Sequence, residues 1–136
     1  PGENDKDFIE TFELIKKIKF VNSYSFIFSP RPGTVASDLK LIDREISMER
    51  LQKVQNQLFE NQIAKNKSQE NKILNVLVEN LAKDNSKVFG RSEYMTSVIF
   101  DGKKSDVGKI VPVKITKSNR SSLFGEKIDN TDQKVA

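Results

Sequence analysis

Residues 72–128 constrain the fold most, because apolar residues there recur at every second position. This alternation is clearest over 73–79 and over 111–116. Three shorter apolar segments complete the region: 87–91, 97–100 and 122–125. A period of two is typical of half-buried strands, and several short strands separated by turn residues predict a small sandwich or closed barrel. We expect a turn at Asp101-Gly102, since glycine takes a positive φ without steric cost.

The same region carries the positive charge of the chain. Residues 72–128 contain nine Lys and two Arg against six acidic residues, a net charge of +5, while the whole chain has a net charge of +4. A small β-barrel with a basic surface commonly holds a nucleic-acid backbone. The alternative is a solvated barrel that is basic without having such a ligand.

Two missing residue types limit the chemistry available to this chain. Its 136 residues include no cysteine and no histidine. This excludes disulfides, thiolate metal sites, cysteine-ligated iron–sulfur clusters and cysteine nucleophiles, and it removes the commonest metal ligand and general base. Catalysis confined to this chain would rest on carboxylates, Lys or Tyr. No apolar run approaches the roughly 18 residues of a membrane span and no signal peptide is visible, so we expect a cytoplasmic protein.

The first 43 residues predict an incomplete α/β unit. The chain starts without Met and continues directly into a predicted helix over 5–19, capped by Asn4 or Asp5, which suggests an internal or processed start. A two-faced strand is predicted over 24–29. Its aromatic face consists of Tyr24, Phe26 and Phe28. One helix and one strand cannot bury these side chains, so we expect their sheet neighbours to precede residue 1 or to belong to another chain.

A long helix is predicted between this unit and the basic region. Asp43 can cap a helix over 44–67, whose narrow apolar stripe is typical of a helix that links two bodies. The polar run 66–71 then marks a boundary. Before the helix, two prolines and a glycine make a rigid loop over 29–34. This loop presents Arg31 either to a ligand or to solvent.

Motifs along nearly the whole chain resemble those of one enzyme family, the tRNA methylthiotransferases. The end of the family's radical S-adenosylmethionine (SAM) domain is resembled by Pro1-Gly2-Glu3, Asp7-Phe8, residues 24–34 and residues 49–52. The TRAM domain that ends these enzymes is resembled by residues 76–79, Gly90-Arg91, residues 108–116 and residues 122–126. The Arg-Pro form of loop 29–34 is most similar to MiaB-type members, which convert isopentenyl-adenosine next to the tRNA anticodon to its 2-methylthio form.

The resemblance implies an α+β chain in four parts. These are the end of a radical SAM α/β barrel (one helix and one strand) over 1–43, a linker helix over 44–70, a small OB-like antiparallel β-barrel of the TRAM type over 71–128, and a disordered tail over 129–136. The family binds one 4Fe-4S cluster through a Cys-x-x-x-Cys-x-x-Cys motif and a second through an N-terminal domain, and this chain contains neither set of cysteines. The chain therefore resembles the tRNA-binding, non-catalytic part of such an enzyme. SAM and both clusters would belong to the full-length polypeptide, and the chain alone should be inactive.

Two other functions stay open at this point. One is a free-standing RNA-binding barrel without catalysis, and the other is a structural barrel that binds protein partners. By resemblance, the barrel should bind the anticodon arm of tRNA. The candidate RNA-binding residues are Lys87, Arg91, Tyr94, Lys103, Lys104, Lys109, Lys114, Lys117 and Arg120. Such cations bind phosphates with release of counterions, and Tyr94 offers a surface for base stacking.

Several candidate residues have an alternative structural interpretation. Phe89 and Phe124 can stack on bases, but core packing is the favoured interpretation for both. Arg91 can contact phosphate or a base, or pair with Glu93 or Glu126. Glu93 and the lack of a glycine at 71–72 are departures from the family pattern.

The resemblance also implies a border of the SAM pocket. Glu3, Ser29 and Arg31 are the candidate cofactor-binding residues, since ligands of this barrel type lie at the carboxyl ends of the strands. For Glu3, the alternative is a helix N-terminal carboxylate stabilised by the helix dipole.

Overall fold

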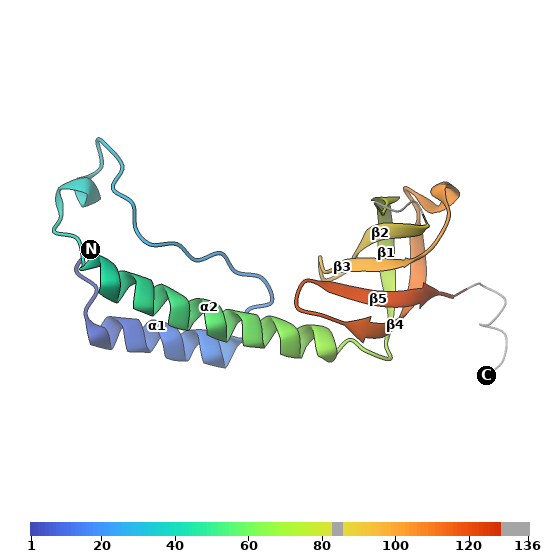
Figure 1. The fold of residues 1–136 in the computed structure, drawn as a ribbon, viewed down its shortest axis with the longest axis horizontal. Helices are drawn as coiled ribbons and strands as arrows, with labels where there is room; N and C mark the ends of the chain where they lie inside the picture. Colours follow the sequence, from blue (N-terminus) through green and yellow to red (C-terminus); the bar gives the residue numbers. More distant parts are fainter. Residues whose placement is uncertain (83–85, 129–136) are drawn as a thin grey trace. The chain divides into compact units, whose positions relative to one another are not determined.

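The computed structural model describes residues 1–82 and 86–128 and divides into two compact units, residues 1–62 and residues 63–136 (Figure 1). The first unit contains helices and an extended segment, and the second contains a β-barrel. The predicted tail over 129–136 lies outside the described residues.

Helix α1 (Asp5–Ile18) begins where the sequence predicts it. The Asn4 side chain accepts hydrogen bonds from the Lys6 and Asp7 amides at 2.9 and 3.1 Å, and the Asp7 carboxylate accepts one from the Asn4 amide at 2.9 Å. This reciprocal capping satisfies amides that have no partner within the helix. The helix ends at Lys19, whose positive φ of 56° breaks the helical backbone.

Helix α2 (Arg44–Lys67) has the predicted bounds. The Asp43 carboxylate caps it by accepting a hydrogen bond from the Glu45 amide at 2.8 Å. Within the first unit, α1 and α2 lie side by side and run in the same direction (Figure 1). The Asn61 amide of α2 donates to the Ile15 carbonyl of α1 at 3.2 Å.

The segment between the two helices is extended but forms no strand. The prediction of a strand over 24–29 is therefore wrong for this chain; the described residues beyond α1 contain only a short 3-10 helix, η1 (Val35–Asp38), before α2 begins. The exposed fractions of Tyr24 and Phe26 are 89% and 83%. A strand needs a neighbouring strand for its hydrogen bonds, and none pairs with this segment in the described residues.

The second unit is a closed barrel of five strands. They are β1 (Ile73–Leu81), β2 (Lys87–Ser92), β3 (Ser97–Asp101), β4 (Ile110–Ser118) and β5 (Ser122–Lys127). Their order around the barrel is β1-β2-β3-β5-β4, with β4 pairing back to β1 (Figure 1). The predicted OB-like barrel is confirmed, but it is not wholly antiparallel. Strands β3 and β5 pair in parallel, because a long connection through η2 (Lys104–Asp106) and β4 separates them in sequence.

One hydrophobic cluster fills the barrel. Its members are Leu74, Val76, Val78, Val88, Val98, Phe100, Val111, Val113, Ile115 and Leu123. Two glycines at inward positions allow this close packing: a Cβ at Gly90 would collide with the Leu77 carbonyl oxygen, and one at Gly125 with the Lys114 carbonyl oxygen. Both glycines lie in motifs that resemble the TRAM domain.

The chain leaves β3 at Asp101-Gly102, as predicted. The reason for glycine at residue 102, however, is not the positive φ that the sequence suggested. Gly102 is not among the glycines with positive φ; instead, a Cβ there would lie 2.6 Å from a methyl group of Val88. The positive φ of this connection, 82°, belongs to Gly108. Glycine at residue 102 is therefore required by packing and not by a left-handed turn.

Candidate nucleic-acid interface

The outer surface of β2, β3 and β5 carries a row of three large apolar side chains, two of them aromatic, which we call the aromatic row. Phe89 of β2 pairs with Ile99 of β3, and Ile99 pairs with Phe124 of β5. All three are half-buried and lie outside the core cluster. The neighbouring inward positions, Val88 and Phe100, are fully buried instead. The interpretation of Phe89 and Phe124 as core residues is therefore wrong: both face the outside of the barrel.

Arg91 covers one end of this aromatic row. Its guanidinium carbon lies 5.5 Å from the centre of the Phe89 ring, a cation–π arrangement. Its Nε lies 3.7 Å from the Glu79 carboxylate, and its Nη1 donates to the Met95 carbonyl at 3.3 Å. The ion pair was expected with Glu93 or Glu126 and is formed with Glu79, because β1 and not the following turn lies beside Arg91.

Tyr94 lies at the tip of the turn between β2 and β3. The buried Ser92 hydroxyl shapes this turn by accepting hydrogen bonds from the Tyr94 and Thr96 amides, both at 3.3 Å. Tyr94 is 49% exposed, and the Lys65 ammonium lies 5.0 Å from its ring centre. Lys65 was not among the predicted residues. Its position at the end of a helix gave no local signal that it would reach the barrel.

The buried side chain of Asn66 holds the loop between β4 and β5 in place. The Asn66 amide nitrogen donates to the carbonyl oxygens of Asn119 and Arg120, both at 2.9 Å, and Asn66 is only 1% exposed. Asn119 in turn accepts from the Ser121 and Ser122 amides at 2.9 and 2.7 Å. The backbone that presents Arg120 is therefore fixed. In OB-folds, this loop is one of the regions that bind oligonucleotides.

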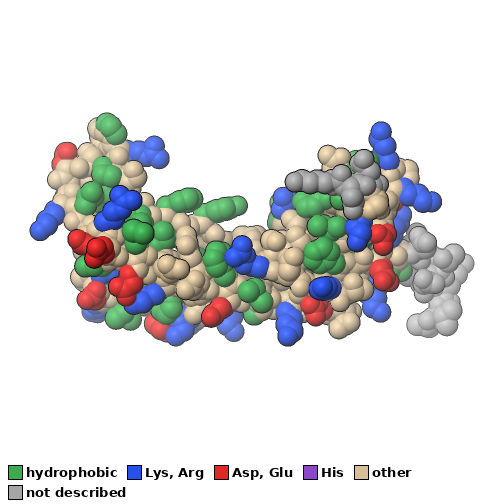
Figure 2. Space-filling view, viewed as in Figure 1, with side chains coloured by type: hydrophobic (Ala, Val, Ile, Leu, Met, Phe, Trp, Pro, Cys, Tyr) green, Lys and Arg blue, Asp and Glu red, His purple; other side chains and the backbone are tan. Residues whose placement is uncertain are grey.

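The predicted basic residues form several groups and not one patch. Lys117 is the β4 partner of Phe124 and continues the aromatic row. Lys87 lies opposite Asp101, and Lys114 lies opposite Glu126. Lys103, Lys104 and Lys109 lie in the β3–β4 connection around η2. In Figure 2, the barrel presents hydrophobic side chains with Lys and Arg side chains around them.

Asp106 anchors the β3–β4 connection to β5. Its carboxylate accepts hydrogen bonds from the Lys127 ammonium at 2.7 Å and from the Lys103 amide at 2.9 Å. These bonds, that from Lys127 first, hold the pKa of Asp106 below its usual range. Lys127 is thereby engaged in the fold through its ammonium, whereas the bond from Lys103 comes from its backbone amide.

The first unit brings two of the three predicted cofactor residues together. Glu3 and Ser29 both line an open cleft of about 870 Å³, while Arg31 is not among its lining residues. The Glu3 carboxylate accepts a hydrogen bond from Arg50 at 2.7 Å, and Asp5 accepts a second from Arg50 at 2.7 Å. Hydrogen bonding to Asp5 and Glu3 raises the pKa of Arg50. Arg50 was missed as a site residue, although it lies in a motif that resembles the family.

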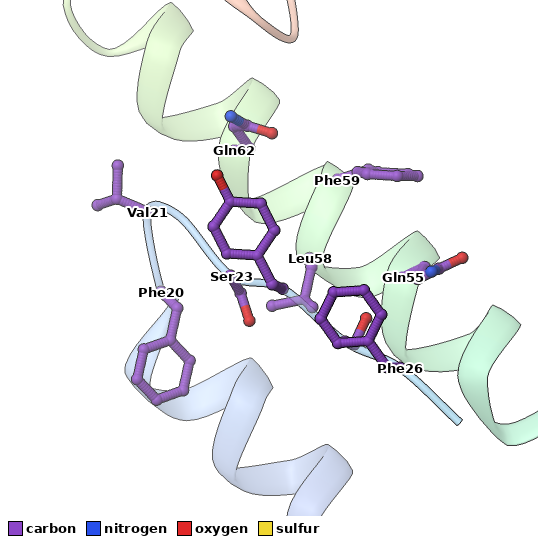
Figure 3. A pocket seen from close by; sticks show the side chains of 10 residues that line it. Phe20, Val21, Ser23, Phe26, Gln55, Leu58, Phe59 and Gln62 are labelled. Atoms are coloured by element: carbon purple, nitrogen blue, oxygen red, sulfur yellow. The ribbon is translucent and has the colours of Figure 1, made fainter. Parts of the chain in front are cut away.

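A smaller hollow of about 230 Å³ lies beside this cleft in the first unit. Figure 3 shows Leu58 of α2 pointing toward the extended segment, with Phe20 and Phe26 to either side. Leu58 is 7% exposed, whereas Phe20 is 40% exposed. The extended segment therefore covers part of α2 but leaves its own aromatic side chains uncovered.

The described residues offer no site for a metal ion. Over 1–82 and 86–128, no group of three His, Cys, Asp or Glu side chains could hold one. Neither of the two described α-helices combines the length and the apolar character needed to cross a membrane. The described surface of the barrel instead carries the outward row of Phe89, Ile99 and Phe124, with basic side chains on the same strands.

Comparison with known proteins agrees with the geometry of the barrel. Residues 67–128 match the family model of the TRAM domain. Over all 136 residues, the chain is 61% identical to a tRNA-2-methylthio-N(6)-dimethylallyladenosine synthase of Pelagibacter ubique, of which it covers 30%. Proteins of the same name from Ruthia magnifica and Rickettsia akari are 43% and 41% identical over 94% and 93% of the chain, which covers 29% of each. The chain thus spans under a third of the length of these curated relatives.

Proposed function

We propose, on the premise that residues 67–128 are a TRAM domain in a chain homologous to part of the tRNA methylthiotransferases, that this chain is the C-terminal, tRNA-binding portion of such an enzyme. The enzyme would be a cytoplasmic radical SAM protein that adds a 2-methylthio group to isopentenyl-adenosine next to the anticodon. The observation that carries the proposal is the closed OB-like barrel with basic side chains on its outer surface. Such barrels bind nucleic acids through a positively charged groove and aromatic side chains.

The first unit supports a connection to further polypeptide. Tyr24 and Phe26 expose most of their surface, and Phe26 also lines the open cleft. We assign residues 1–43 to the end of a radical SAM barrel, 44–70 to a linker helix and 71–128 to the RNA-binding barrel. Exposed apolar surface of this kind commonly marks a contact with another protein segment. Here that segment would be the remaining part of the same polypeptide. The barrel, in turn, would bind the anticodon arm of the tRNA.

The chain's own residues do not fit an iron–sulfur cluster. There is no cysteine or histidine in the sequence, and the described residues hold no group of three potential ligands. Both clusters of the proposed enzyme would therefore be ligated by other parts of the polypeptide, and the chain alone would be inactive.

The cleft of the first unit fits a border of the SAM pocket better than a complete pocket. Glu3 and Ser29 line the cleft with a carboxylate and a hydroxyl group, and Arg31 follows Ser29 closely in sequence. In the full-length enzyme, Ser29→Ala and Arg31→Ala should weaken SAM binding, measured by calorimetry without turnover. Lys6→Ala, an exposed residue on the same unit, is the control. Unchanged SAM affinity in both variants would remove these residues from the pocket.

Salt-dependent binding of tRNA to the 136-residue chain tests the proposed function. For about three to five phosphate contacts, log K against log salt concentration should fall with a slope of about −2 to −5. Lys117→Ala, on the barrel, should reduce this slope by about one. Lys53→Ala, which removes an exposed lysine paired with Glu49 in the first unit, should leave it unchanged. A flat salt response of the unaltered chain would contradict the proposal.

A separate observation distinguishes an enzyme portion from a free-standing RNA-binding protein. The coding sequence upstream of Pro1 should contain three clustered cysteines with the spacing Cys-x-x-x-Cys-x-x-Cys. Their absence would favour the free-standing protein even if tRNA binding is found, because the barrel could then act without catalysis.

A further inference from the structure

We infer that the outward row Phe89–Ile99–Phe124 is a stacking platform for unpaired RNA bases, so that the barrel recognises a single-stranded segment and not only a charged duplex. This inference rests on the proposed function, since it names the form of RNA that the barrel would take. It is carried by the orientation of the row and by the unequal distribution of charge around it.

The row is not needed to fill the core of the barrel. The core is already filled by a separate cluster that includes Val88, Phe100 and Leu123. Phe89, Ile99 and Phe124 are cross-strand partners on three successive strands, so their side chains form one continuous outer surface. Aromatic side chains on the outer face of an OB-like barrel are where bases stack in single-strand-binding proteins.

The charge around the row is one-sided. On the side of the β2–β3 turn, the next outward positions are Arg91, Ser97 and Ser122, which are aligned across the three strands. Tyr94 with Lys65, and the fixed loop that carries Arg120, lie at this same end of the barrel. On the opposite side of the row, the outward positions are Lys87, Asp101 and Glu126.

This asymmetry suggests how an RNA strand lies on the barrel. Phosphates would follow the side with Arg91 and the two serines, where no acidic side chain lies among the outward strand positions next to the row. The Glu79 carboxylate, 3.7 Å from Arg91, is on the neighbouring strand β1. Bases would extend from there over the aromatic row, with Lys117 at its far end. Asp101 and Glu126 would keep phosphates from the other side.

Only unpaired bases can use such a platform. In a duplex, the base faces are stacked on each other and are not available to side chains. A duplex would contact the barrel through its phosphates alone, so its affinity would depend on the basic residues and not on the aromatic rings.

The test compares two RNA probes and a matched set of variants. The probes are an unpaired RNA of mixed sequence that carries 2-aminopurine, and a blunt-ended duplex of the same sequence with its complementary strand. The variants of the 136-residue chain are Phe89→Leu and Phe124→Leu, which keep apolar volume but remove the aromatic face. The control is Phe26→Leu, the same change at an exposed position of the first unit.

Each barrel variant should bind the unpaired RNA about 5- to 100-fold more weakly. The salt slope should be unchanged, the affinity for the duplex should stay within about two-fold, and quenching of 2-aminopurine fluorescence should be lost. Unchanged thermal unfolding would exclude a folding defect, and a variant that does unfold is replaced by Phe→Met at the same position. Equal losses for both probes, or no loss for either, would overturn the stacking platform while leaving tRNA binding by the barrel intact. If the unaltered chain bound neither probe, the proposed function itself would fail.

Discussion

The two units of this chain differ in how completely each buries its own apolar residues. The barrel unit encloses ten buried hydrophobic residues in one cluster. In the first unit, all of which is described, only Ile15 and Leu58 are buried hydrophobic residues. Meanwhile Tyr24 and Phe26 of that unit are more than four-fifths exposed. The difference is between a unit that encloses its own apolar core and a unit whose aromatic side chains stay largely exposed.

The two units also differ in how far their extended backbone segments are paired by hydrogen bonds. In the barrel, each strand pairs on both sides, so the sheet has no free edge. In the first unit, residues 23–30 are extended but belong to no sheet. An extended segment with aromatic side chains and no paired strand is stable only when another sheet edge or apolar surface covers it. Closure of the barrel therefore satisfies the strand edges within the unit itself.

The largest expected effect contrasts two phenylalanines. Phe100 in the barrel core is 1% exposed, so Phe100→Ala should lower the free energy of unfolding by about 3–5 kcal/mol. Phe26→Ala should change it by less than about 0.5 kcal/mol, because that ring is mostly in solvent. The two tyrosines, Tyr24 and Tyr94, provide one fluorescent reporter in each unit, and the chain has no Trp.

The measurement uses urea unfolding followed by tyrosine fluorescence. In a Tyr24→Phe background, the signal comes from Tyr94 and reports the barrel alone; in a Tyr94→Phe background, Tyr24 reports the first unit. A Phe26→Ala loss as large as that of Phe100→Ala would mean that the first unit also buries its aromatic residues in solution, against the comparison drawn above.

A smaller effect is expected from the same substitution at two asparagines. Asn66 is buried and donates two hydrogen bonds to the β4–β5 loop, so Asn66→Ala should cost about 1–3 kcal/mol by leaving carbonyl oxygens unpaired. Asn61 donates one longer bond, of 3.2 Å, to the Ile15 carbonyl. Asn61→Ala should cost about 0.5–1.5 kcal/mol. Thermal unfolding with the two tyrosine reporters measures both, and a reversed order would show that the loop is not held by Asn66.

Local patterns predicted the parts of the fold that local forces determine. The bounds of α2 follow from the Asp43 cap and the end of the apolar stripe, and α1 follows from the Asn4 cap. The predicted strand over 24–29 had the right alternation but no partner, and strand formation depends on a partner far away in sequence. Local alternation therefore could not decide it.

For the candidate site, the sequence predicted which types of residue are present but not which of them face outward or contact one another. Period-two alternation says that residues of β2 and β5 face two sides, but not which side is inside, so Phe89 and Phe124 were assigned to the core. The structure places them outside because Val88 and Leu123 fill the interior. Likewise, the Arg91–Glu79 ion pair and the approach of Lys65 to Tyr94 depend on strand register and helix position, which no short motif encodes.

The smallest expected effect contrasts two aspartates and is read from pH. Asp106 is buried and bonded to Lys127, which holds its pKa below the usual range. A carboxyl group with a lowered pKa in the folded state stabilises the fold above its unfolded pKa, about 3.9, and this stabilisation is lost as pH falls through the folded pKa. Asp106→Asn should therefore cost about 1–2 kcal/mol at neutral pH and progressively less as pH falls below about 3.9.

Asp5 is the matched case in the first unit. It also accepts a 2.7 Å bond, from Arg50, but its side chain is 93% exposed. Solvent screens such pairs, so Asp5→Asn should produce little change at any pH. The comparison is made by thermal unfolding from pH 2 to pH 7, with Tyr94 reporting the barrel and Tyr24 the first unit. A pH-independent difference for Asp106→Asn would mean that the negative charge of the carboxylate does not contribute to stability, against the role of the Lys127 bond.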